Sequence, residues 1–224
     1  MPRVVRRNIL ILLLTGFVPS MFYSYLFMYL PIVVNERAGG VGLALGMSAA
    51  MALSTLFPLV GGILADSVGR RPMAVLSTLS LALPLFLLLF GGPLPALLSL
   101  VLLHSLSFLT SPGVTALIAE SAEAGVRGRV FSLLNTASSV AWIVGPVSIN
   151  WLASLLGLDV LLRIAVIATC LLSLPRLILA ETLAKRRSVM GSLSELRGRL
   201  AAALRGVRSV RALLSSPLSP LALL

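Results

Sequence analysis

The segment from residue 62 to residue 72 holds a close group of opposite charges. Asp66 precedes Arg70 and Arg71 by four and five positions. An unpaired charge beside long apolar stretches is costly, so Asp66 needs a partner, and either arginine is near enough to serve. Gly69 permits a positive φ in a tight turn, and Pro72 suits the first turn of the next helix. The residue types therefore predict an ion-pair network in a short turn; a plain basic turn with an incidental Asp66 is the alternative.

Polar side chains inside two apolar stretches form a second candidate site. His104 lies about ten residues into one stretch, where an ionisable side chain usually faces protein or water. It could bind a substrate or carry a proton; the alternative is a neutral histidine bonded to a neighbouring carbonyl. Helical spacing predicts that two sets of residues each share one face, and Asn135 is a separate polar candidate: Thr15, Phe22, Tyr25 and Tyr29, and His104, Ser107, Ser111 and Thr115.

Several kinds of chemistry lack the residues they need. His104 and Cys170 are the only residues of their types, which excludes an intrachain disulfide and a zinc site built from histidine and cysteine. His104 has no acid nearby in the sequence and no nucleophile motif, so an intramembrane enzyme has little support. There is no nucleotide-binding loop, and direct ATP hydrolysis is not expected. We predict neither an enzyme nor a protein with a cofactor or metal.

The composition places these residues in a membrane. The chain has 224 residues, of which 58% are hydrophobic and 11% charged. A soluble domain has about 45–50% apolar and about 25% charged residues. The mean hydropathy of this chain is +1.06. Such an apolar composition also excludes intrinsic disorder. The composition therefore predicts an integral membrane protein with the lipid bilayer as its partner.

Six segments are long and apolar enough to cross a bilayer, which takes about 20 residues for each helix. A basic start followed by an apolar run also resembles a signal peptide, but no small-residue cleavage site follows the first segment. We therefore expect an all-α membrane protein with six transmembrane helices near residues 9–30, 41–65, 73–90, 94–119, 130–156 and 160–180.

The net charge of +11 predicts an orientation in the membrane and not nucleic-acid binding. Basic residues collect in cytoplasmic loops. If both termini are cytoplasmic, Arg37 alone lies in an outer loop, and Arg163 and Arg176 lie near the ends of the sixth helix. The remaining basic residues are then all on the cytoplasmic side: Arg3, Arg6, Arg7, Arg70, Arg71, Arg127, Arg129, Lys185, Arg186, Arg187, Arg197, Arg199, Arg205, Arg208 and Arg211.

The pattern of the chain changes after the sixth segment. We expect residues 1–182 to form the six-helix bundle and residues 183–214 to form a basic amphipathic helix on the cytoplasmic leaflet. A linker helix packed on the protein is the alternative. Residues 215–224 begin another apolar run, which resembles the start of a truncated seventh helix.

Residues 62–71 read Gly-Ile-Leu-Ala-Asp-Ser-Val-Gly-Arg-Arg. This resembles the signature loop of the major facilitator superfamily, Gly-x-Leu-Ala-Asp-Arg-x-Gly-Arg-Arg, with Ser67 in place of the basic residue. The position after the second of six helices fits. Glu120, then Arg127 to Arg129, and the Glu181-Thr182 pair are also similar to that family. The resemblance covers residues 1 to about 185 and implies the N-terminal half of a twelve-helix transporter, built from two inverted three-helix repeats.

The resemblance implies a role for several residues. Asp66, Arg70 and Glu120 would form a charge network at a gate, in a loop that also holds Gly62, Gly69, Arg71 and Arg127. In the family this loop contacts the eleventh helix when the transporter is open to the outside. That helix has no counterpart in these 224 residues, which puts the gating cycle of an isolated copy in doubt. Helices one and four line the family's central cavity, where His104 would lie.

Small residues recur on two of the expected helices. Gly42 and Gly46 follow one stripe on the second helix, and Ala141 and Gly145 follow one on the fifth. Such stripes let helix backbones approach closely within a bilayer, as Gly62 would also do. They can be satisfied within the bundle, but the family uses these helices between its two halves, so we expect a missing half or a second copy there. Pro146 after Gly145 is a weak likeness to the antiporter motif and otherwise a helix kink.

The composition predicts a multi-pass membrane protein, and the resemblance implies a plasma-membrane transporter that moves a small solute by alternating access. A half-size homodimeric transporter and a truncated, non-transporting scaffold are the alternatives. No carboxylate lies at mid-membrane, so a proton carrier is not evident apart from His104. The sequence does not indicate which solute is moved.

Overall fold

The computed structural model describes residues 3–123 and 125–183, which lie in one compact unit of the chain. This part is helical: α1 (Arg3–Ser67), α2 (Arg70–Leu88), α3 (Pro93–Ser121), α4 (Arg127–Leu156), α5 (Leu158–Ser173) and the 3-10 helix η1 (Leu174–Ile178). The expectations for a tail helix at 183–214 and an apolar start at 215–224 fall outside the described residues, apart from Leu183.

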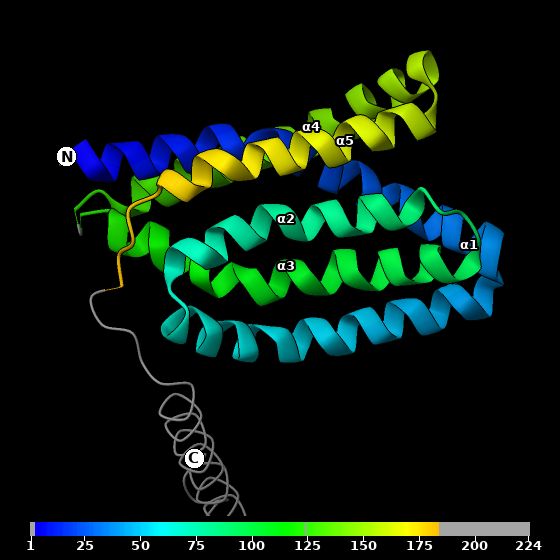
Figure 1. Cartoon of the computed structure of the whole chain (residues 1–224), viewed down its shortest axis with the longest axis horizontal. Coiled ribbons are helices and arrows are strands. Elements are labelled where there is room, and N and C mark those ends of the chain that lie inside the picture. Colours follow the sequence, from blue (N-terminus) through cyan, green and yellow to red (C-terminus); the bar gives the residue numbers. More distant parts are fainter. Residues whose placement is uncertain (1–2, 124, 184–224) are drawn as a thin grey trace, which may run out of the picture. The chain divides into compact units, whose positions relative to one another are not determined.

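Helix α1 contains two helical segments separated by a kink at Gly39. It has 65 residues, and Gly39 alone leaves the helical region, with φ 71° and ψ 172°. Only glycine adopts such a conformation readily, so the break falls at this residue. Figure 1 shows α1 running away from the N-terminus and returning beside α3. The expected loop near residues 31–40 is shorter than predicted, because the helix continues through Glu36 and Arg37 to Ala38.

Within the described residues, five helices have the length and composition of a membrane span. Four of them match the predicted segments to within a few residues, with α5 and η1 together corresponding to the sixth segment. The helix boundaries follow the breakers: α3 begins at Pro93 after a pair of glycines, and Gly157 separates α4 from α5.

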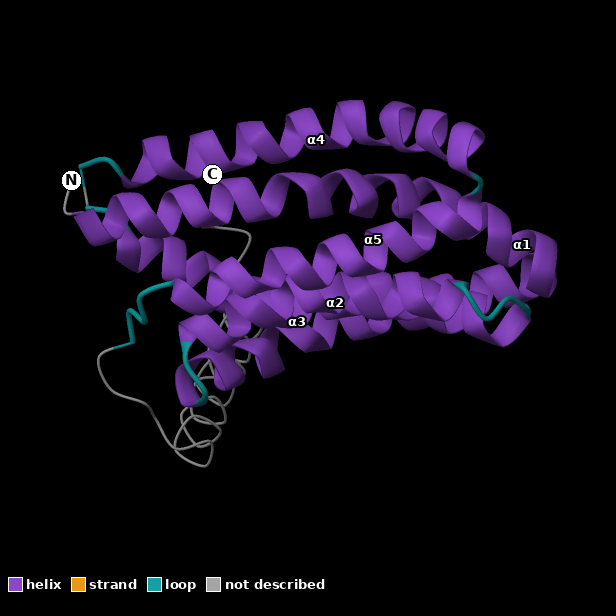
Figure 2. Ribbon diagram, turned by 45° about the horizontal axis from the view of Figure 1, so that its top comes forward, coloured by secondary structure: helices purple, strands orange, loops and turns teal. Residues whose placement is uncertain are grey.

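Helix α3 lies between α2 and the returning part of α1 (Figure 1). Helix α4 packs on α1 and α5 packs on α2 (Figure 2). The largest core cluster includes Leu26 and Leu30 of α1, Leu85 of α2 and Leu100 of α3, all with no exposed area. Large apolar side chains also cover the outside. Since a lipid-facing surface is as apolar as an interior, these exposed faces fit a bilayer.

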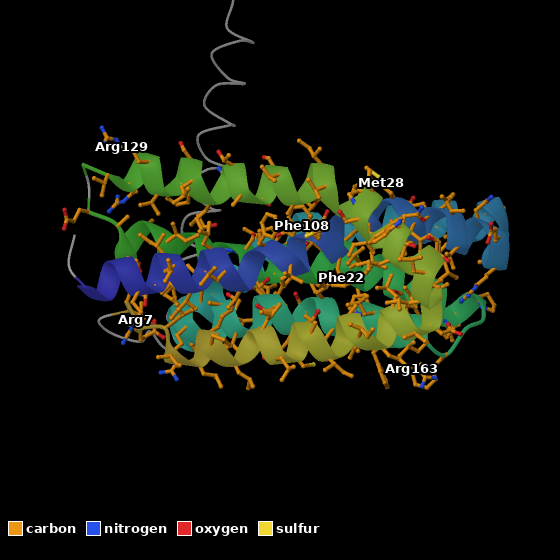
Figure 3. All side chains as sticks on the ribbon, turned by 90° about the horizontal axis from the view of Figure 1, so that it is seen from above. Arg7, Phe22, Met28, Phe108, Arg129 and Arg163 are labelled. Carbon is orange, nitrogen blue, oxygen red and sulfur yellow. The ribbon has the colours of Figure 1, made fainter. Side chains whose placement is uncertain are left out.

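Charged residues lie toward the ends of the helices. Figure 3 shows Arg7 and Arg129 toward the end where α1 begins, and Arg163 toward the opposite end. Phe22 of α1 lies between these two ends, in the largest core cluster. Charges at the ends with apolar middles are what a membrane span requires.

Candidate functional site

Arg70 joins three helices at one end of the bundle. Its guanidinium lies 3.1 Å from the Asp66 carboxylate and 3.1 Å from the Glu120 carboxylate. Asp66 ends α1, Arg70 begins α2 and Glu120 ends α3, so one cation bridges three helix termini. The structure therefore brings together the three residues expected to form the network.

The exposure of these side chains sets the strength of the network. The Arg70 side chain is 14% exposed, and those of Asp66 and Glu120 are 36% and 38% exposed. Ion pairs open to solvent contribute about 0–1 kcal/mol each. Pairs of that strength can form and break with modest changes in free energy, as a switch requires.

Glu181, which lies 111 positions after Arg70 in the chain, caps α2. Its carboxylate accepts hydrogen bonds from the backbone N–H groups of Arg70 (3.0 Å) and Arg71 (3.2 Å). A helix begins with unpaired N–H groups that favour an anion, and the N-cap residue of α2, Gly69, has no side chain with which to cap them. Burial opposes ionisation of Glu181, but backbone hydrogen bonds, including one from Leu183, hold the pKa of this carboxyl below its usual value.

Gly69 is needed at this cap for two reasons. Its φ is 120°, which confirms the positive φ expected in the turn and is a conformation that other residues rarely adopt. A Cβ at this position would also collide with the Glu181 carboxylate. The same end is tied further by Thr182, whose hydroxyl donates to Glu120 over 2.6 Å.

Asn8 closes this end of the bundle and was not anticipated from the sequence. Its amide nitrogen donates to the Ser121 hydroxyl (3.1 Å) and the Ala180 carbonyl (3.3 Å), and its amide oxygen accepts from the Ala180 N–H (3.0 Å). Asn8 is 1% exposed. The available signal was an amide placed directly before the first apolar run.

Arg71 and Arg127 do not join the network through their side chains. Both are exposed, and neither forms an ion pair with any residue that the structure describes. The close-packed glycine in this part of α1 is Gly61 and not Gly62. A Cβ at Gly61 would collide with the Leu109 carbonyl of α3, whereas a Cβ at Gly62 would meet nothing within 4 Å.

His104 lies in an aromatic cluster. Its ring centroid is 4.9 Å from that of Phe27, whose ring also packs on Trp142 and Tyr23. The Nδ1 atom lies 2.9 Å from the Leu100 carbonyl, so this nitrogen carries the proton and donates it. Nε2 is buried with no hydrogen-bond partner among the described residues. The carbonyl contact matches the structural alternative for His104, and Nε2 is a buried polar atom whose hydrogen-bonding capacity is unused among the described residues.

The other residues of the predicted α3 face lie at different depths. Ser107 is half-buried and its hydroxyl is 3.3 Å from the Tyr23 hydroxyl, whereas Ser111 is exposed. Asn135 of α4 is exposed as well. Tyr23 and Phe27 are therefore the aromatic residues of α1 that meet this face, and the sequence reasoning missed both.

Three of the four residues on the predicted cavity face of α1 have little exposed area. Thr15, Phe22 and Tyr25 are buried, with 3%, 7% and 7% exposed, and Phe22 and Tyr25 belong to the largest core cluster. Tyr25 stacks on Tyr29 with ring centroids 5.3 Å apart, and both line a groove against Pro146 and Asn150 of α4. Core faces and cavity faces of a membrane protein both accept aromatic side chains, so helical spacing alone does not distinguish the two.

The small-residue stripes pack largely inside the described bundle, contrary to expectation. Ala141 is fully buried, and a Cβ at Gly145 would collide with the backbone of Met21 in α1. A Cβ at Gly46 would lie 3.1 Å from Leu97 of α3. These positions allow α4 and α3 to approach α1, so a second half or second copy is not needed to explain them. Gly42 differs, because a Cβ there would meet only Ala38.

Arg176 is a further residue whose role the sequence reasoning missed. It lies in η1 with 6% of its area exposed. Arg163 has Asp159 four positions before it, but the positions three and four from Arg176 are leucine, serine and alanine. An arginine inside an apolar run without such an acid was the available signal.

Among the described residues, no group of three or more His, Cys, Asp or Glu side chains could hold a metal ion.

Comparison with known proteins identifies the class of this fold. Helices of membrane length, joined at one end by the Asp66–Arg70–Glu120 network, are what the resemblance to a transporter family implies. The family model of the Major Facilitator Superfamily matches residues 12–224, and the chain belongs to that superfamily.

Two curated relatives cover part of the chain. It is 31% identical over 137 residues to the multi-drug resistance efflux pump PmrA of Streptococcus pneumoniae serotype 4, which is 58% of this chain and 34% of PmrA. It is 36% identical over 120 residues to the minor myo-inositol transporter IolF of Bacillus subtilis, which is 52% of this chain and 26% of IolF. The matched segments thus span about a third or less of these relatives.

Solved structures share the fold. The peptide transporter POT in complex with sulfate superposes with a TM-score of 0.66 at 20% identity, over 96% of this chain and 46% of POT. The human organic anion transporter MFSD10 superposes with a TM-score of 0.65 at 20% identity, over 84% of this chain and 51% of MFSD10. The chain therefore has the fold of about half of each of these proteins.

Proposed function

We propose that the chain forms one six-helix half of a plasma-membrane transporter that moves a small solute by alternating access. Two halves that rock about a site near the bilayer midplane expose that site to each side in turn. The 65 residues of α1 supply two crossings, one before Gly39 and one after it. Helices α2, α3 and α4 supply one crossing each, and α5 with η1 supplies the sixth. An even number of crossings places the two ends of the bundle, residues 3 and 183, on the same side of the membrane. The distribution of basic residues favours the cytoplasmic side.

The observation that carries this proposal is the Asp66–Arg70–Glu120 network. Arg70 holds three helix ends together through two solvent-exposed ion pairs. We infer that this network ties the cytoplasmic ends of the three helices together in one state of the transport cycle, and that its exposed acids allow the contact to be released in the other state. Either a second six-helix segment or a second copy of the chain completes the pathway. A membrane scaffold that transports nothing has no use for a network that can be released.

The solute site is proposed on the face that carries His104. The unpaired Nε2 of His104 and the exposed Ser111 and Asn135 supply polar groups, and Phe27 and Trp142 supply aromatic surface. The relatives point to two solute classes to try first, namely drug-like organic molecules and polyols.

The test is solute movement in cells that express the chain, alone or with a second six-helix half. A fluorescent drug-like dye and labelled myo-inositol are the probes. We expect Asp66→Asn to slow movement by up to about fivefold, the equivalent of about 1 kcal/mol in the barrier, without loss of protein from the membrane. Glu36→Gln, an exposed acid before the Gly39 break, is the matched control and should leave the rate unchanged. Equal rates for wild type and Asp66→Asn would contradict the role of the network.

A further inference from the structure

Arg176 is a buried cation whose hydrogen-bond partners are all neutral. Its Nε donates to the Thr15 hydroxyl over 2.9 Å, and its Nη1 donates to the Ala74 carbonyl over 2.8 Å and to the Ser77 hydroxyl over 2.6 Å. No carboxylate of residues 3–123 or 125–183 forms an ion pair with it. Its second terminal nitrogen, Nη2, has no hydrogen bond to any described residue.

A charge in this setting is unfavourable by itself. Removing a guanidinium from water costs several kcal/mol unless an opposite charge or enough acceptors replace the water. Arg70 shows the compensated arrangement, because it meets two carboxylates. Arg176 has three neutral acceptors and keeps a net charge of one inside the bundle, so its surroundings are complementary to a single negative charge.

A cavity gives that charge a place to bind. A space of about 150 Å³ lies between α1, α2, α3 and η1. Arg176 lines it together with hydroxyl-bearing side chains and a few apolar ones. Thr78, which also lines it, is 1% exposed, and its Oγ1 has no hydrogen-bond partner among the described residues. Polar cavities of this kind hold ligands or water. The other hydroxyls on the wall belong to Ser20, Tyr23, Ser77, Ser80 and Ser107.

We propose that this cavity is a binding site for a monoanionic oxygen group, a carboxylate or a phosphodiester. One oxygen of the anion accepts from Arg176 Nη2, and Thr78 Oγ1 donates to the same group. Arginine is suited to oxyanions because its planar guanidinium presents several donors in a fixed arrangement. One cation matches one negative charge, so a monoanion is favoured over a dianion. The site would exist whether or not the chain moves a solute.

Two sources can supply this anion, namely the carboxylate of a small solute and the phosphodiester of an anionic lipid headgroup. Thermal unfolding of the purified full chain separates them. One arm compares sodium acetate with sodium chloride at equal ionic strength in neutral detergent. The other compares nanodiscs of phosphatidylcholine alone with nanodiscs that also contain phosphatidylglycerol. We expect acetate or phosphatidylglycerol to raise the Tm of the wild type by about 2–4 °C, because a ligand that binds the folded state stabilises it.

Variants assign that response to the cavity. Arg176→Met removes the cation and should abolish the rise in Tm, whereas Thr78→Val removes one donor and should reduce it. Arg163→Met is the matched control, since Arg163 is an exposed arginine at the other end of the same span and should keep the full rise.

The outcomes decide the proposal. A response to acetate alone assigns the site to a soluble carboxylate, and a response to phosphatidylglycerol alone assigns it to a lipid headgroup. The proposal is overturned if the wild type responds to neither, if Arg176→Met responds like the wild type, or if Arg163→Met loses the response equally. If Arg176→Met does not fold, an unchanged response of Thr78→Val overturns it.

Discussion

Arg70 and Arg176 carry the same side chain in opposite electrostatic surroundings. Arg70 lies at a helix end between two carboxylates, whereas Arg176 is buried among neutral acceptors. We propose that the first cation is part of a contact that is released during transport, and that the second binds an anion from outside the chain. The functional difference comes from the partners and not from the residue type.

At the same scale, Glu181 gives a prediction about pH. The pKa of its carboxyl lies below the usual value in the folded chain. A group with a depressed folded pKa contributes stability above its unfolded pKa, about 4.3, and that stability is lost as the pH falls through the folded pKa. We expect Glu181→Gln to lower the free energy of unfolding by about 0.5 kcal/mol at pH 7, a capping value reduced for solvent exposure.

Unfolding of the wild type and Glu181→Gln measured from pH 7 to about pH 3 checks this expectation. The difference between the two proteins should shrink as the acid titrates. A difference that stays the same across this range would show that the charge of Glu181 does not cap α2.

At the scale of the elements, the positions of the helices were predictable and their faces were not. Apolar length and glycine or proline breakers define α2 to α5, because a span must be long and apolar and these residues end it. The Asp66–Arg70 pair follows from a spacing of four. The buried faces of Phe22 and Tyr25 do not follow, since lipid and protein interior select the same apolar residues.

Two adjacent glycines test which face of α1 packs on α3. A Cβ at Gly61 would collide with the Leu109 carbonyl, and a Cβ at Gly62 would meet nothing within 4 Å. We expect Gly61→Ala to lower the free energy of unfolding by about 1–3 kcal/mol, because the helices must separate. Gly62→Ala, the matched control, should be neutral or slightly stabilising, since alanine favours the helix over glycine.

Thermal unfolding of the two purified variants distinguishes these expectations. A larger loss for Gly62→Ala than for Gly61→Ala would mean that α1 is rotated relative to α3 from the arrangement described here.

At the scale of the whole molecule, membrane class and superfamily were accessible from composition and from residues 62–71. Those signals are local, so one sequence contains them. The contacts of Arg176 with Thr15 and Ala74, and the cap of α2 by Glu181, join residues more than 100 positions apart. Spacing along the chain does not encode such contacts, and they appear only once the helices are packed.

The proposed alternating-access mechanism requires that the face carrying His104 opens to each side of the membrane in turn. Ser111 lies exposed on that face, and Cys170, the only native cysteine, is exposed on α5. The measurement is labelling by a membrane-impermeant maleimide in right-side-out and inside-out vesicles. It compares the native chain with the Cys170→Ser, Ser111→Cys variant, each with the second half or copy that supports transport.

Alternating access predicts that the cysteine at position 111 is labelled from both sides and that Cys170, facing lipid, is labelled from neither. It also predicts that Asp66→Asn changes the ratio of labelling from the two sides. A cysteine at position 111 that stays inaccessible from both sides, or is labelled from one side only with or without Asp66→Asn, would contradict the transport mechanism proposed for this chain.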